Sequence, residues 1–322
     1  DKILTYLQDD GDFVEPIYYL PIIPLILVNG TKGIGTGFST DIMSYNPLQI
    51  IQYLENMLNN KKELGVIEPY YKNFKGSIKL CDESGKKYLI KGVYDILGND
   101  KIRITELPVG SWTQDYKEFL ETLMINKDKN YIKDYSDMST ESNVEFEIQF
   151  YPNIVSKLLA EKYDYGLEGI EKYLKLYTTQ STTNMHLFNE KEQLKKYDNI
   201  YQIIEEYYSI RLEYYNKRKL YLIDLLSKQL ITLDNKARYI KGNLNDTIDL
   251  RKKTKDQIND LLFNLKFDKD FENDNYNYLI KMPMDSVSQE NVDKLLKEHN
   301  NKKSELDKIT NSKINDLWLE EL

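Results

Sequence analysis

The residues whose types and spacing best suit a specific chemistry lie between positions 30 and 37, where four of eight residues are glycine. An apolar run with strand character, 22–28, leads into them. Glycines remove side chains, so another molecule's backbone can come close or the chain can adopt positive φ. Ile34 is the bulky apolar residue between Gly33 and Gly35, and neither neighbour offers it a side chain to pack against.

Three interpretations of this segment compete on the residues alone. A dinucleotide or phosphate cradle also begins with a strand and a glycine-rich turn, but Gly33, Gly35 and Gly37 form GxGxG rather than GxGxxG, and no helical period follows before Asn46–Pro47. A tight structural turn explains the glycines but not the isolated isoleucine. A nucleic-acid loop would push Ile34 between base steps while its bare backbone lies against phosphates.

Further motifs make the third interpretation specific. The chain resembles type II DNA topoisomerases of the eukaryotic and large-DNA-virus kind over essentially its whole length. The segments that carry this resemblance, all in the family's order, are 15–24, 28–30, 33–37, 104–113, 184–188, 195–198 and 276–283.

The resemblance implies a role for the glycine segment. In that family the isoleucine of the GIGTG loop inserts between DNA base pairs and bends the duplex, and Ile34 matches it residue for residue. The same resemblance implies a DNA-contacting loop made of Asn29, Gly30, Lys32, Gly33, Gly35, Thr36 and Gly37.

The resemblance also implies which chemistry lies elsewhere. Strand cleavage by these enzymes needs a tyrosine nucleophile and acids that hold Mg²⁺. We expect that tyrosine a few tens of residues before Asp1 and reject Tyr239, which follows Ala237–Arg238 but falls inside a long helical pattern. The Mg²⁺-binding and ATPase domains have no counterpart here, so we expect no cofactor or metal to be bound by this fragment; Mg²⁺ and ATP belong to the parent enzyme.

Two acidic or histidine-bearing features are weaker candidates. The run Asp9–Asp12 has carboxylates suited to a hard metal but lacks the other ligands of a calcium loop, and we interpret it as a surface connection. His186 and His299 lie far apart in the sequence, and we expect packing or surface roles for both.

Composition limits the class of protein. The 322 residues suffice for two or three domains, no apolar stretch approaches 18 residues, and the single cysteine, Cys81, excludes an internal disulfide or a cysteine-built zinc site. The net charge of −8 argues against a simple DNA-binding module. Residues 1–60 carry two Lys/Arg against seven Asp/Glu, and residues 61–110 carry ten against seven, so a phosphate-facing patch must be local.

Glycine and proline divide the chain into two kinds of structure. Eleven of the 14 glycines lie in residues 1–110, whereas 153–282 contains no proline, so the first part predicts turns and strands and the later part long helices. The expected elements are a helix that starts at Asn46–Pro47, a meander over 74–107, a helix from 113 to about 123 and an alternating strand over 144–150.

A long helix is predicted from 198 to about 243, where apolar and tyrosine residues recur at three- and four-residue steps. Such a helix would reach about 65 Å and needs a partner helix along its stripe. We assign its tyrosines to packing rather than base stacking, and Trp112 and Trp318 to the core. The charged helical tail over 287–314 is the candidate partner.

These observations and the resemblance predict an α+β fragment of an ATP-dependent type II topoisomerase, intracellular, nuclear if cellular, or in host cytoplasm or virion if viral. It would bind double-stranded DNA and the missing domains of its own enzyme, form a homodimer through the coiled-coil gate, and avoid membranes. A structural coiled-coil dimerisation module without DNA role is the alternative. The expected domains are a DNA-bending segment with winged-helix end (1–60), a tower (61–197), a coiled-coil arm (198–244), a helical exit gate (245–285) and a returning helix (286–322).

Overall fold

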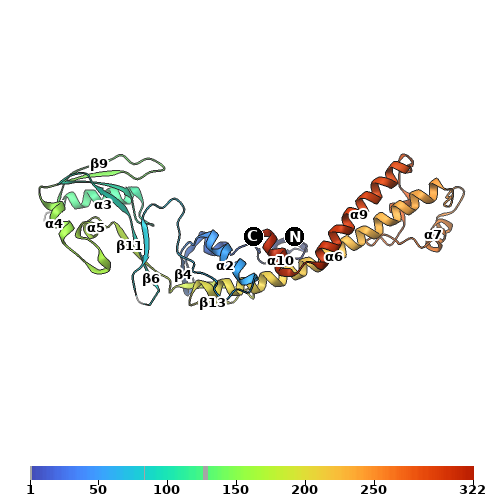
Figure 1. Cartoon of the computed structure of the whole chain (residues 1–322), viewed down its shortest axis with the longest axis horizontal. Coiled ribbons are helices and arrows are strands. Elements are labelled where there is room, and N and C mark those ends of the chain that lie inside the picture. The colour runs from blue at the N-terminus through green and yellow to red at the C-terminus, as the bar shows by residue number, and fades with distance from the viewer. Residues whose placement is uncertain (1, 83, 126–129) are drawn as a thin grey trace. The chain divides into compact units, whose positions relative to one another are not determined.

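The structure, a computed structural model, describes residues 2–82, 84–125 and 130–322 and has a mixed α+β fold (Figure 1). The chain divides into two compact units. One is Ile23–Tyr207, here called the hairpin unit; the other, the long-helix unit, joins the residues up to Ile22 with Tyr208–Leu322. The predicted α+β fold class is confirmed.

The hairpin unit opens with a short helix where the sequence predicted a strand. Helix α1 spans Leu25–Asn29, and Leu27 within it is fully buried. Pro24 precedes its first turn, and Gly30, at φ 66°, ends it. A short apolar run does not distinguish a strand from a buried helix by periodicity, so the strand prediction for 22–28 was wrong.

Two strands and a helix follow α1. Strand β3 (Thr31–Gly35) pairs antiparallel with β4 (Phe38–Ile42). Helix α2 (Pro47–Leu58) begins as predicted, because the Asn46 side chain accepts a hydrogen bond from the Leu48 amide.

The predicted meander over 74–107 forms four strands, but they belong to two different sheets. Gly92 lies at the switch, where an added Cβ would lie 2.3 Å from the Glu106 carbonyl oxygen. One sheet has the order β11-β6-β5 and the other β7-β8-β10-β9, with all neighbours antiparallel. The strands are β5 (Ser77–Leu80), β6 (Lys87–Lys91), β7 (Val93–Ile96), β8 (Lys101–Glu106), β9 (Ile132–Asp137), β10 (Phe146–Phe150) and β11 (Tyr177–Ser181).

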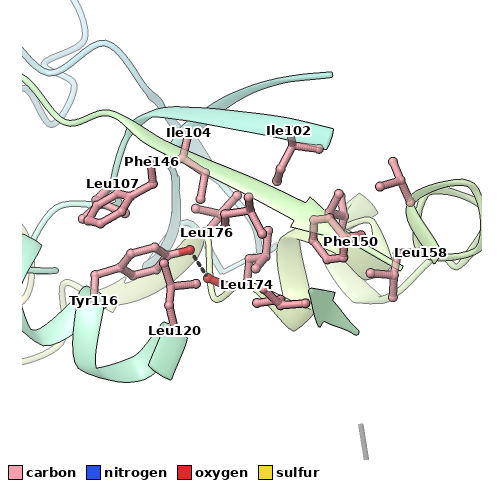
Figure 2. Close-up of a cluster of buried hydrophobic side chains, with 14 residues drawn as sticks. Ile102, Ile104, Leu107, Tyr116, Leu120, Phe146, Phe150, Leu158, Leu174 and Leu176 are labelled. Carbon is pink, nitrogen blue, oxygen red and sulfur yellow. Dashed lines mark hydrogen bonds between the residues drawn. The ribbon is translucent and has the colours of Figure 1, made fainter. Parts of the chain in front are cut away.

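The four-stranded sheet is covered on one face by helices and forms the largest apolar core shown (Figure 2). Strand β10 alternates as predicted, with Phe146, Ile148 and Phe150 almost fully buried. The Tyr116 hydroxyl donates to the Leu174 carbonyl oxygen at 2.7 Å, which satisfies both groups inside the core. The covering helices are α3 (Thr113–Ile125), α4 (Ile154–Ala160) and α5 (Gly169–Tyr173), with a 3₁₀ turn at Asp164–Gly166.

A small hairpin completes the hairpin unit. Strands β12 (Met185–Phe188) and β13 (Leu194–Tyr197) pair antiparallel, and β12 also lies beside β4. Helix α6 begins directly afterwards, at Ile200, and runs for 45 residues to Leu244, close to the predicted bounds.

The long-helix unit is built around α6. It contains the β1–β2 hairpin and four further helices beyond α6, and α9 runs beside α6 (Figure 1). Their bounds are β1 (Tyr6–Asp9), β2 (Asp12–Pro16), α7 (Lys255–Asn264), α8 (Asn277–Ile280), α9 (Gln289–Asn311) and α10 (Ile314–Glu321), with a 3₁₀ turn at Met284–Ser286.

The two tryptophans differ in environment. Trp318 of α10 is fully buried, stacks on Tyr208 and Tyr215 of α6, and donates its indole hydrogen to the Ile22 carbonyl oxygen at 3.1 Å. Its predicted core role is confirmed. Trp112 is 74% exposed, so the same prediction for it was wrong: it lies in the turn before α3, outside the buried face of that helix.

Among the described residues, none of the helices combines the length and the apolar character that crossing a lipid bilayer needs.

Candidate nucleic-acid interface

The glycine segment forms a tight β-hairpin. We call Thr31–Ile42, which contains β3, β4 and the turn at Thr36–Gly37, the glycine hairpin. Ile34 lies opposite Ser39 near its tip, and its side chain is 94% exposed. No other described large hydrophobic side chain is as exposed, so Ile34 contributes almost nothing to the packing of its own unit.

Three of the four glycines are needed by the hairpin itself. Gly30 and Gly37 have positive φ angles of 66° and 85°. A Cβ on Gly35 would lie 2.6 Å from the Phe38 ring. Gly33 differs, because its φ lies outside the left-handed range and, among the described residues, no atom lies within 4 Å of the position of an added Cβ.

This geometry does not suit a dinucleotide cradle. Residues after Gly37 continue as strand β4, and the next helix, α2, begins only at Pro47. A cradle needs a helix N-terminus at the last glycine, so that amides and the helix dipole face the phosphates. The glycine hairpin instead presents an apolar side chain to solvent.

Strand alternation places Lys32 and Ile34 on one face of the hairpin. The Lys32 side chain is 84% exposed, and its ammonium lies 3.9 Å from the Asp41 carboxylate. A cavity of about 620 Å³ lies beside these two residues. Most of its other lining groups are hydroxyls, amides and backbone: Asn29, Gly30, Thr31, Ile42, Ser44, Tyr71, Val109, Gly110, Thr178, Thr179, Gln180, Ser181, Thr183 and Asn184.

The structure therefore places all the sequence-predicted site residues in or beside one hairpin. Thr36 and Gly37 are exposed in its turn, and the Asn29 carbonyl oxygen accepts a hydrogen bond from the Ser44 hydroxyl at its base. Residues of 180–188 that contact β4 were missed as site residues. The signal available for them was the 184–188 motif, which carried the resemblance without a role.

The Tyr239 hydroxyl does not have the environment of a nucleophile. Its side chain is 5% exposed and packs with Ile248, Leu262 and Phe267 in a cluster of the long-helix unit. Burial raises the pKa of the phenol, the direction opposite to what attack on phosphate needs. These observations agree with its rejection as a catalytic residue.

The acidic run near the N-terminus forms the turn between β1 and β2, with Asp10 at φ 49° and Gly11 at φ 92°. Its residues are exposed. Over the described ranges, no three or more His, Cys, Asp or Glu side chains are grouped so that they could hold a metal ion.

Comparison with known proteins identifies the family. The family of DNA gyrase/topoisomerase IV, represented by the A-type subunit of those enzymes, matches residues 1–322. The chain belongs to this family of type II DNA topoisomerases, and the resemblance predicted from its motifs is confirmed.

Individual relatives agree with that assignment. DNA topoisomerase 2 of Pisum sativum is 35% identical and that of Plasmodium falciparum (isolate K1 / Thailand) is 36% identical, each over 100% of this chain. DNA topoisomerase 2-alpha of Cricetulus griseus is 33% identical over the same span. The chain spans only 24%, 25% and 23% of these three relatives, about a quarter of each.

A solved structure matches the fold closely. The crystal structure of the Plasmodium falciparum topoisomerase II DNA-binding, cleavage and re-ligation domain superposes with a TM-score of 0.89 and 35% sequence identity. The match covers 99% of this chain and 45% of that one.

Proposed function

We propose that this chain is part of an ATP-dependent type II DNA topoisomerase, which passes one duplex through a transient double-strand break in another. Within that enzyme, the chain bends the duplex to be cut. The single observation that carries this proposal is the 94% exposed Ile34 on a hairpin with little side-chain cover. A bulky side chain so placed can enter a base step and kink the duplex.

Gly33 supports the same role. Its own fold gives no described reason for the missing side chain, since an added Cβ would meet no described atom within 4 Å. A backbone kept bare next to an exposed wedge lets a phosphate or sugar come close. The glycine thus has a purpose only when another molecule is present.

The cavity beside Lys32 suggests how an acidic chain contacts phosphates. Ser, Thr, Asn and Gln side chains and backbone amides make many phosphate contacts in protein–DNA interfaces. The cavity lining is rich in these uncharged groups, and Lys32 supplies a cation at its edge. Contact of this kind needs no overall positive charge.

The long-helix unit would supply the homodimer. We assign 198–244 with 286–322 to a coiled-coil arm, 245–285 to an exit gate and 61–197 to a tower. Two observations support the arm and gate. Lys219 of α6 donates to the Thr310 carbonyl oxygen of α9 at 3.0 Å, and Phe263 and Phe271 are 71% and 50% exposed near the helical cluster.

Cleavage chemistry would come from other parts of the enzyme. The proposal places the nucleophilic tyrosine, the Mg²⁺-binding acids and the ATPase site in domains that relatives of greater length have room for. The chain alone is then expected neither to cut nor to reseal supercoiled plasmid. The enzyme would act where its DNA is, in a nucleus or with a viral genome.

Replacement of Ile34 tests the proposal. A duplex labelled with a fluorophore at each end reports bending by energy transfer when the 322-residue chain is added. Ile34→Ala should abolish most of the bending and leave the melting temperature unchanged, because the side chain is exposed. Leu48→Ala, at another exposed aliphatic position (72%), is the matched control and should bend DNA as the wild type does. Equal bending by wild type and Ile34→Ala would reject the proposal.

A further inference from the structure

The outer edge of β4 is bonded to the segment Asn184–Phe188, which we call the brace. The Asp41 amide donates to the Asn184 carbonyl oxygen at 2.8 Å. The Asn184 side-chain amide donates to the Ser39 hydroxyl at 2.9 Å. Ser39 is the residue that faces Ile34 across the hairpin, so the brace contacts the strand directly behind the exposed isoleucine.

His186 adds a second bond to the same residue. Its Nδ1 lies 3.0 Å from the Ser39 carbonyl oxygen and 2.9 Å from Oδ1 of Asn184. Both oxygens are acceptors, so Nδ1 carries the hydrogen and donates. Ser39 is thus held through its hydroxyl and its carbonyl by two neighbouring brace residues.

An aromatic contact connects the brace to the hairpin tip. The rings of Phe38 and Phe188 meet edge to face, with centroids 5.8 Å apart and planes at 87°. The Phe38 ring also occupies the space where a Gly35 side chain would be, since an added Cβ would lie 2.6 Å from it. Phe188 is 60% exposed, so its ring supports the hairpin tip rather than a buried core.

A two-stranded hairpin is marginally stable by itself and cannot resist a load. Opening a base step costs free energy, and the base pairs push back on the side chain that opens it. A wedge therefore works only when its support is already rigid before DNA arrives. The brace pairs with β13 and contacts β4, which extends the two glycine-hairpin strands into a larger structure.

We propose that Asn184, His186 and Phe188 are positioning residues that hold Ile34 against the DNA stack. This inference rests on the proposed function. The residues touch the hairpin rather than the duplex, and they lie about 150 positions away from it in the sequence, as the 145- and 147-residue separations of their bonds show.

Variants of His186 separate positioning from simple folding. His186→Ala removes the donor, whereas His186→Asn places an amide NH₂ near the position of Nδ1 and His186→Gln places it too far out. On a fully paired duplex, the bent fraction should fall about three- to tenfold in His186→Ala, the scale of one net hydrogen bond. His186→Asn should restore it, and His186→Gln should not.

A second duplex makes the result specific. Two unpaired bases at its centre create a flexible joint that bends at little cost. His186→Ala and Phe188→Ala should bind and bend this duplex as the wild type does, since no stacked step must be opened. Lys196→Ala, opposite His186 on β13 and exposed, is the control and should match the wild type on both duplexes.

The outcomes distinguish this inference from the proposed function. If the wild-type chain leaves the paired duplex straight, the proposed function itself fails. If Ile34→Ala abolishes bending while His186→Ala and Phe188→Ala bend the paired duplex normally, the proposed function stands and the brace is wrong. Equal losses on both duplexes would show a structural role alone and would also overturn the inference.

Discussion

At the scale of single residues, the glycine hairpin shows how missing side chains divide between two purposes. Gly37 needs its φ of 85° for the turn, and Gly35 makes room for the Phe38 ring. Gly33 has neither need among the residues that the structure describes. Stability and DNA binding should therefore respond oppositely at neighbouring glycines.

Gly33→Ala should leave the chain as stable as before or raise its free energy of unfolding by about 0.4–1 kcal/mol, since alanine reduces the entropy of the unfolded chain. The same variant should bind and bend duplex DNA less well, because the new methyl group faces the approaching backbone. Denaturant unfolding and fluorescence anisotropy with a labelled duplex measure the two effects.

Gly37→Ala is the matched control. It should destabilise the hairpin by about 1 kcal/mol, because alanine does not tolerate the positive φ of the turn. If Gly33→Ala proves as destabilising as Gly37→Ala, or leaves DNA binding untouched, the interpretation of Gly33 is wrong.

At the scale of elements, the docking of α10 on α6 depends on one large ring. Trp318→Ala removes a fully buried indole and its hydrogen bond to Ile22, and should cost about 3–5 kcal/mol. Trp112→Ala, at a 74% exposed position, should change stability by less than about 0.5 kcal/mol. Thermal unfolding of the two variants checks both values, and a similar loss in each would contradict the packing described.

The four-stranded sheet should show a pH-dependent stability. Lys101 and then Arg103 hydrogen-bond to Glu147, and these bonds lower the pKa of its carboxyl. A lowered folded-state pKa stabilises the fold above the unfolded value and loses that effect as the pH falls through the folded value. Glu147→Gln should therefore lower the melting temperature at neutral pH, and its difference from the wild type should vanish in acid.

Glu141→Gln provides the comparison for that measurement, because Glu141 is exposed on the turn between β9 and β10. It should follow the wild type at every pH. A Glu147→Gln difference that persists unchanged at low pH would show that the carboxylate's charge is not its source.

Elements with strong local signals could be predicted from the sequence. Helix α2 was located by Asn46–Pro47, β10 by its alternation and α6 by its long apolar period. Tertiary context decided the rest: α1 was assigned as a strand, and one expected meander was divided between two sheets at Gly92. Local patterns do not record which distant segment an edge will meet.

The candidate site divides along the same line. The hairpin residues are contiguous, so a single motif located them together. The brace contacts that hold Ser39 span 145 and 147 residues, and no spacing rule in the sequence predicts such a pairing. Trp112 was misplaced for a related reason, because an aromatic next to a helix start is exposed or buried according to the turn it occupies.

At the scale of the whole molecule, a chain of net charge −8 is proposed to bind a polyanion. A broad electrostatic surface is then not the main source of affinity, and salt should weaken binding less than it does for basic modules with many phosphate contacts. Uncharged hydrogen bonds from the cavity and the insertion of Ile34 would provide the specific part. Insertion is thus the claim on which the account depends.

The most direct test places 2-aminopurine at the centre of a duplex, where its fluorescence is quenched while it remains stacked. Addition of the wild-type chain should raise the emission at one base step, and Ile34→Ala should leave it quenched even when binding is saturated. Emission that stays quenched with the wild type at every probe position, or that rises equally with Ile34→Ala, would contradict the insertion of Ile34 into DNA.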